Sequence, residues 1–170
     1  MKEEISNIQD AVISLGKKIC APDNLLIVRS VPYSDATPFL LFEDGKFVYS
    51  SIERNYQIFR RETSSSDEVL HWIFDEIIST IITESEDFRV IDDVNEGRKK
   101  FILERINLME RLNPIWGKMA REESSAELEI LDSAIAASKK KSDAASVMEK
   151  LHVWLVEKRL LPRCGSGSKR

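Results

Sequence analysis

Apolar residues near the start of the chain recur every three or four positions. Such spacing gathers them on one face of a helix. The residues are Ile5, Ile8, Val12, Ile13, Leu15 and Ile19. Ala21-Pro22 follows them, and a residue before proline disfavours the helical conformation. The pattern therefore predicts an amphipathic helix over about residues 3–20, then a loop over residues 25–38 with at most one short strand from Leu25 to Val28.

The pattern changes at Phe39 from helical spacing to short β-prone runs. Residues 39–42 and 46–49 flank Asp44-Gly45, a dipeptide that suits a two-residue hairpin turn because both positions tolerate positive φ. A second turn is expected at residues 53–55, where Asn55 tolerates the same region, and a third strand over Tyr56–Arg61. We predict a three-stranded antiparallel meander.

Helical spacing returns after Ser64. Ser65 and Glu68 fit a capping box, and the apolar stripe that follows predicts the main core helix. It comprises Val69, Leu70, Ile73, Phe74, Ile77, Ile78, Ile81 and Ile82. Residues 84–96 are expected to form an acidic loop.

Four further helical stretches are expected beyond that loop. Helix resumes near Gly97 and breaks at Asn113-Pro114, where proline suits the first turn of a helix over residues 115–123. Ser124 with Glu127 resembles another capping box, and a last helix opens at Ser142 or Asp143 and stops at Pro162. The fold class is thus α+β: an N-terminal helix, a small three-stranded antiparallel sheet, then a C-terminal run of four to five helices.

Charge is distributed unevenly along the 170 residues, although the net charge is only −4. Residues 1–62 carry −1, residues 63–97 carry −9, and residues 98–170 carry +6. A block of one sign attracts a partner of the opposite sign, unless basic residues from elsewhere fold beside it. The central block is a candidate interaction surface.

Composition and termini indicate a cytoplasmic protein. No apolar run is long enough to span a membrane, and the charged start Met1-Lys2-Glu3-Glu4 lacks the apolar centre of a secretion signal. Cys20 and Cys164 are therefore expected to be reduced thiols rather than a disulfide. The Gly-Ser tail over residues 164–170 is expected to be flexible.

No pattern of catalytic, cofactor-binding or metal-binding residues is found. Phosphate-binding glycine loops and nucleophile elbows are absent, and His71 and His152 lie in no metal-ligand spacing. Asp92-Asp93 lacks the oxygen count and glycine of a calcium loop. We expect no catalytic residue, no metal and no cofactor.

One ordered set of motifs resembles the bacterial immunity-protein family numbered sixty-three among polymorphic toxin systems. The set runs from about residue 20 to residue 123 and includes a turn, an arginine-rich strand, the start of the core helix and a proline-tryptophan junction. Its pieces are Pro22-Asp23-Asn24-Leu25-Leu26, Glu53-Arg54-Asn55, Phe59-Arg60-Arg61-Glu62-Thr63, the stretch from Asp67 and Glu68 through His71-Trp72-Ile73-Phe74 to Glu76, and Leu112-Asn113-Pro114-Ile115-Trp116. Asn55 and His71 stand where a glycine and a tyrosine are expected, and residues 84–96 differ from the family pattern.

The resemblance implies an immunity-protein-like α+β domain over residues 1–123, a helical extension packed on it over residues 124–163, and a tail over 164–170. Its motif residues are expected to be structural, with Trp72 and Trp116 in the core. Arg60 and Arg61 point to opposite sheet faces, so at most one can pair with Glu53 or Glu68 beneath the helix.

The resemblance also implies a function in binding a cognate toxin protein, with no membrane. Our hypothesis is that six acidic residues form part of the toxin-binding surface: Glu84, Glu86, Asp87, Asp92, Asp93 and Glu96. The alternative for this segment is a solvated loop with no partner. Nucleic acid is not favoured as a partner, although a regulatory nucleic-acid-binding protein using the basic C-terminal helices stays an alternative. A small enzyme with an unrecognised site is the remaining alternative. The oligomeric state does not follow from the sequence.

Overall fold

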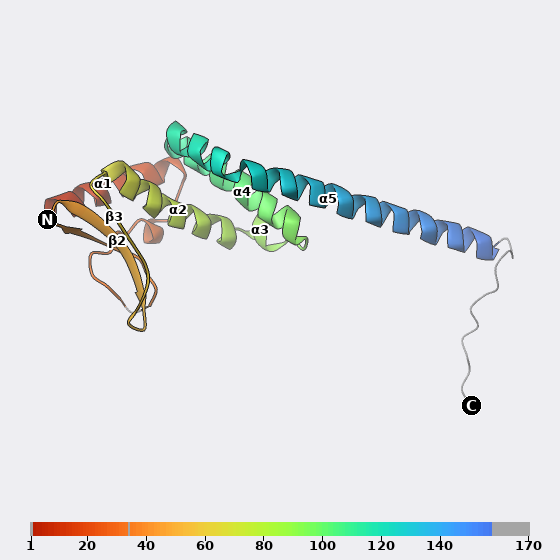
Figure 1. The fold of residues 1–170 in the computed structure, drawn as a ribbon, viewed down its shortest axis with the longest axis horizontal. Coiled ribbons are helices and arrows are strands. Elements are labelled where there is room, and N and C mark those ends of the chain that lie inside the picture. Colours follow the sequence, from red (N-terminus) through yellow and green to blue (C-terminus); the bar gives the residue numbers. More distant parts are fainter. Residues whose placement is uncertain (1, 34, 158–170) are drawn as a thin grey trace, which may run out of the picture. The chain divides into compact units, whose positions relative to one another are not determined.

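The computed structural model describes residues 2–33 and 35–157 and has the predicted α+β architecture (Figure 1). The elements in order are α1 (Lys2–Lys18), the 3-10 turn η1 (Asp23–Leu25), β1 (Phe39–Glu43), β2 (Lys46–Glu53), β3 (Tyr56–Thr63), α2 (Ser66–Glu84), α3 (Glu86–Arg89), α4 (Val94–Leu112) and α5 (Pro114–Glu157). The chain divides into two compact units, residues 1–126 and residues 127–170.

The sheet is the predicted meander, with strand order β1-β2-β3 and both pairs antiparallel. Both turns have two residues in the left-handed region: φ is 49° and 75° at Asp44 and Gly45, and 48° and 71° at Arg54 and Asn55. These values match the primed turns whose twist suits a hairpin. Residues 47–51 of β2 are all buried, so the middle strand is covered on both faces.

Helix α2 is the centre of the core, as its apolar stripe predicts. It contacts α1, α4, β2 and β3, and Val69, Phe74 and Ile78 are fully buried. Each such side chain contributes about 1.5–3 kcal/mol when it leaves water. Figure 1 shows α1 and α2 next to each other beside the sheet.

The start of α2 is tied to the end of β3 by an extended form of the predicted capping box. The Glu68 N–H donates to the Ser65 Oγ at 3.3 Å. The Glu68 carboxylate accepts a 2.6 Å bond from the Thr63 hydroxyl, which itself accepts from the Ser65 N–H at 3.0 Å. Only half of the predicted box therefore forms: the Ser65 N–H donates to the Thr63 hydroxyl and not to the Glu68 carboxylate, and Thr63 links the two residues.

Several predicted boundaries are wrong. Helix α5 is continuous from Pro114 to Glu157, so no helix begins at Ser124 or at residues 142–143. The physical reason is that serine, aspartate and lysine lower helix stability only modestly. Without a glycine or proline they do not end a helix whose flanking residues are strong helix formers. Residues 25–28 contain no strand but part of η1, and residues 84–96 contain α3 and the start of α4. Cys20 is a free, exposed thiol. Cys164, Pro162 and the tail lie outside the described residues.

A close approach between α4 and α5 depends on Gly117. A β-carbon added there would lie 2.5 Å from the Glu110 Cβ and 2.6 Å from its Cα, distances that require the backbone to move. By contrast, a β-carbon at Gly97 would lie 3.6 Å from its nearest neighbour, a methyl group of Ile91, which is ordinary contact.

We expect Gly117→Ala to lower the free energy of unfolding by about 1–3 kcal/mol, because overpacking forces the two helices apart. Gly97→Ala is the matched control and should leave stability unchanged or raise it by up to about 1 kcal/mol through helix propensity. Urea unfolding followed by circular dichroism measures both. Equal effects of the two substitutions would contradict the close approach.

Candidate functional site

The acidic segment 84–96 connects α2 to α4 through the single turn of α3. Helix α2 ends at Glu84, and Asp93 caps α4 by accepting a 2.9 Å bond from the Glu96 N–H. All six predicted carboxylates are exposed to solvent: Glu84, Glu86, Asp87, Asp92, Asp93 and Glu96. The structure therefore brings them onto one short stretch of surface, while Asp93 also has a local structural role.

Three contacts hold this segment against α4. The rings of Phe88 and Phe101 meet edge to face at 6.2 Å, and the Lys100 Nζ donates to the Asp87 carbonyl at 3.0 Å. The Ile91 side chain packs beside Gly97, where no side chain intervenes. The segment is consequently a packed connection, not the irregular loop that its composition predicts.

Exposed apolar residues lie among the carboxylates. Val90 is 76% exposed and Val94 is 83% exposed. A hollow of about 420 Å³ opens beside Val94, lined by Thr83, Phe88, Ile91, Asp92, Asp93, Val94, Gly97, Arg98 and Phe101. Apolar contacts rimmed by polar groups are typical of protein interaction surfaces. The valines were not predicted as contact residues, because in the sequence Val90 stands between Arg89 and Ile91 and Val94 between Asp93 and Asn95, and neither position marks an exposed apolar side chain.

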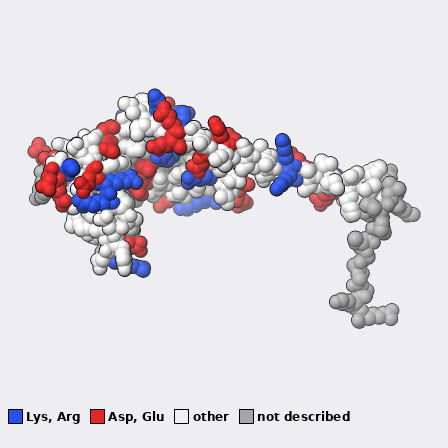
Figure 2. Space-filling view, in the orientation of Figure 1, with Lys and Arg blue, Asp and Glu red and all other residues white. Residues whose placement is uncertain are grey.

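Basic residues offset part of the charge of this surface. Residues 84–100 carry the six acidic residues and four basic ones, a net of −2. Figure 2 shows Lys and Arg among Asp and Glu on the face in view, so neither sign forms an unbroken patch there. The local field is weaker than the −9 of residues 63–97 suggests.

The described part of the chain holds no group of three or more His, Cys, Asp or Glu that could bind a metal ion. Its helices also lack the apolar length that a bilayer crossing requires.

Among the predicted motif residues, Trp116 connects the proline-tryptophan junction to the start of α2. The indole N–H of Trp116 donates to the Asp67 Oδ2 at 3.1 Å, although 49 positions separate them. The Asn113 amide donates to the other oxygen of Asp67 at 3.5 Å, and its own Oδ1 accepts from the Ile115 N–H beyond Pro114. Trp116 is 2% exposed, which confirms its prediction as a core residue.

Trp72, predicted as a core residue, is only half-buried, and its ring lies between α2 and the sheet. Its ring stacks on that of Tyr49 at 6.4 Å, and the Arg61 guanidinium lies over it at 5.7 Å. Arg61 is thus the arginine on the helix side, where it stacks on aromatic rings, while Arg60 pairs with Glu62 at 2.8 Å. Two further motif residues, Glu53 and Arg54, contact each other at the exposed hairpin turn. The Arg54 Nε lies 3.9 Å from the Glu53 Oε1.

Comparison with known proteins gives one match. Residues 43–126 match the family model described as Immunity protein 63. No curated protein and no solved structure matches the chain. The matched segment runs from the end of β1 to the end of the first compact unit, and Pro22-Asp23-Asn24-Leu25-Leu26 lies outside it.

We expect Asp67→Ala to lower the free energy of unfolding by about 1–3 kcal/mol, because it leaves the buried Trp116 N–H without an acceptor. Asp67→Asn keeps an acceptor oxygen and should cost less, about 0.3–1 kcal/mol for the lost charge at the start of α2. Chemical denaturation of both variants measures the difference. Losses of the same size would show that the hydrogen bond contributes nothing.

Proposed function

Because residues 43–126 make this chain a member of the Immunity protein 63 family, we propose that it binds and neutralises a cognate bacterial toxin by protein–protein contact. Binding protects the cell that produces both proteins, and the chain catalyses no reaction. Its place of action is the cytoplasm. The family match is the observation that carries this proposal.

We also propose that the exposed surface of the acidic segment 84–96, which includes α3, forms part of the toxin contact. Exposed carboxylates attract a basic partner and speed its approach, while Val90 and Val94 offer apolar area that leaves water on contact. The position of this surface inside the matched segment 43–126 supports the assignment.

The first prediction concerns toxin capture. The tagged protein should co-purify with the product of the adjacent gene, and its expression should restore growth of cells that make that product. Failure of both capture and rescue would reject the toxin-binding function. Binding to random DNA that weakens steeply with salt would instead favour the basic helices as a nucleic-acid site.

A second prediction concerns the rate of association. Four substitutions remove charge without touching the Asp93 cap: Glu84→Gln, Glu86→Gln, Asp87→Asn and Asp92→Asn. They should lower the association rate constant about three- to tenfold at low salt and flatten its dependence on ionic strength. Stopped-flow or surface-based kinetics with the toxin measures this change.

The control changes net charge by the same amount at four exposed positions elsewhere: Glu3→Gln, Glu43→Gln, Asp10→Asn and Asp44→Asn. Its association rate should fall much less. If both sets slow association equally, only the total charge matters and residues 84–92 are not at the interface.

A further inference from the structure

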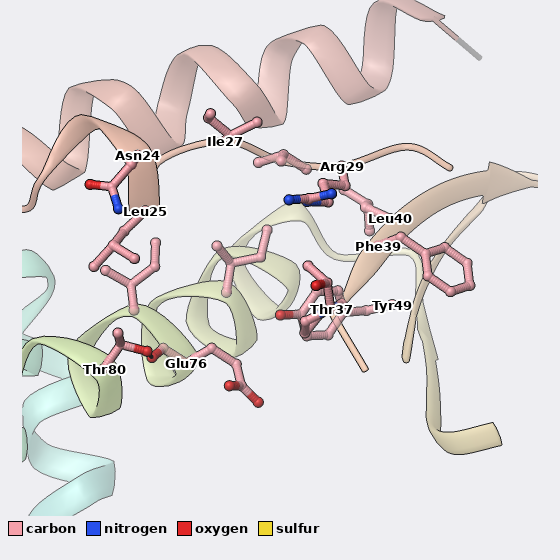
Figure 3. Close-up of a pocket in the computed structure, with 14 residues that line it drawn as sticks. Asn24, Leu25, Ile27, Arg29, Thr37, Phe39, Leu40, Tyr49, Glu76 and Thr80 are labelled. Atoms are coloured by element: carbon pink, nitrogen blue, oxygen red, sulfur yellow. Dashed lines mark hydrogen bonds between the residues drawn. The ribbon is translucent and has the colours of Figure 1, made fainter. Parts of the chain in front are cut away.

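A cavity of about 320 Å³ lies between the loop after α1, the start of β1 and the middle of α2 (Figure 3). Its walls come from segments far apart in the sequence and combine apolar residues with six polar ones: Asn24, Arg29, Thr37, Tyr49, Glu76 and Thr80. The apolar lining residues are Leu25, Ile27, Val28, Pro38, Phe39, Leu40, Ile73 and Ile77. Pockets of this composition with a few convergent polar groups are typical ligand sites.

Tyr49 supplies the first of these polar groups. The residue is 5% exposed, and its ring packs against those of Phe59 at 5.4 Å and Trp72 at 6.4 Å. Figure 3 shows its side chain at the cavity wall. Within the described part of the chain its hydroxyl makes no hydrogen bond, and this oxygen is not among the fully buried unpaired atoms, so it is open to the cavity. The hydroxyl therefore has capacity for a ligand.

Glu76 supplies the second polar group, at the rim of the same cavity (Figure 3). Within residues 2–33 and 35–157, its carboxylate makes no hydrogen bond or ion pair. Burial raises the pKa of the Tyr49 phenol well above its usual value, and the charge of Glu76 raises this pKa further, while the charge of Arg61 lowers it. Tyr49 consequently stays neutral, able to accept a hydrogen bond from a cation that Glu76 attracts.

Arg29, the cation that lines the cavity, is engaged elsewhere. Its guanidinium stacks on the ring of Tyr33 at 4.9 Å. It also lies close enough to Asp35 to help lower the pKa of that carboxyl, after the larger effect of the Thr37 N–H. The described structure places no ion pair between Arg29 and Glu76, so the Glu76 carboxylate can form a direct ion pair with a ligand, although Arg29 keeps its positive charge in the same lining.

We propose that this cavity holds a cationic side chain, a lysine or arginine, of the toxin; this inference rests on the proposed function. The aliphatic stem packs on Ile73 and Ile77, where apolar contact stabilises it. The charged end pairs with the exposed Glu76 carboxylate and donates a hydrogen bond to the Tyr49 hydroxyl. Such an inserted side chain is a typical affinity-determining contact of an interface.

The cavity can be tested without the toxin. N-α-acetyl-lysine amide, titrated into the full chain and followed by methyl NMR, should shift the resonances of Ile73 and Ile77 saturably, with a dissociation constant of about 1–10 mM. N-α-acetyl-norleucine amide has the same stem without the charge and should bind at least tenfold more weakly. Absence of saturable shifts, or equal binding of both probes, would overturn the proposal.

Two conservative variants locate the interaction. Glu76→Gln and Tyr49→Phe should each weaken binding of the lysine probe about five- to tenfold. The matched controls Glu129→Gln and Tyr56→Phe alter an exposed carboxylate on α5 and an exposed hydroxyl on β3, and both should bind like the parent. Methyl spectra of the four variants that match the parent spectrum away from each substitution would show that the fold is intact. A Glu76→Gln protein that binds the probe as tightly as the parent would overturn the assignment.

A final arm distinguishes a toxin side chain from a free amine. With the toxin, Glu76→Gln and Tyr49→Phe should raise the dissociation rate constant about tenfold, and the controls should not. Unchanged dissociation alongside intact probe binding would mean that the cavity takes a small free amine, which overturns the toxin assignment alone. A parent chain that does not bind the toxin would reject the proposed function and the toxin assignment together, while the probe titration would still decide whether the cavity binds cations.

Discussion

The hydrogen bond from the Trp116 indole to Asp67 constrains the helical half of the first unit. The indole is almost fully buried and its N–H has to find an acceptor. Asp67 provides one from the first turn of α2, and the same carboxylate receives the amide of Asn113, the residue that ends α4 and precedes α5. One side chain therefore sets the relative position of three helix ends. A second polar contact joins α2 and α4, where the Arg105 Nε donates to the Asp75 Oδ1 at 2.6 Å.

Local sequence determines most of the fold, and those parts were predictable. Asp44-Gly45 and Arg54-Asn55 specify the two hairpins because positive φ is required at both positions of each turn. The apolar stripe of α2 identifies the main core helix. The breaks expected within α5 were wrong because serine and lysine only modestly affect helix stability, and Ser124 is buried within the helix without ending it.

The candidate site was predictable only in part. Charge can be counted along a sequence, so the carboxylates of residues 84–96 were found, and the structure confirms that they are exposed. Whether basic residues lie beside them depends on how α3 folds onto α4, and Lys100 reaches Asp87 only through that packing. The cavity of Tyr49 and Glu76 combines residues 27 positions apart across a sheet and a helix, and no local pattern marks such a pair.

The long separation between Asp67 and Trp116 also has a consequence for the timing of synthesis. The contacts of β1, β2, β3 and the start of α2 join near neighbours in the chain, and they can form while translation continues. The helix ends at Asp67 can close only after Trp116 has emerged from the ribosome. At about 5–20 residues per second, synthesis of the 49 positions that separate them takes roughly 2–10 s. The start of α2 therefore waits for this interval without the residue that closes it, and the helical half of the first unit is the last part to complete its contacts.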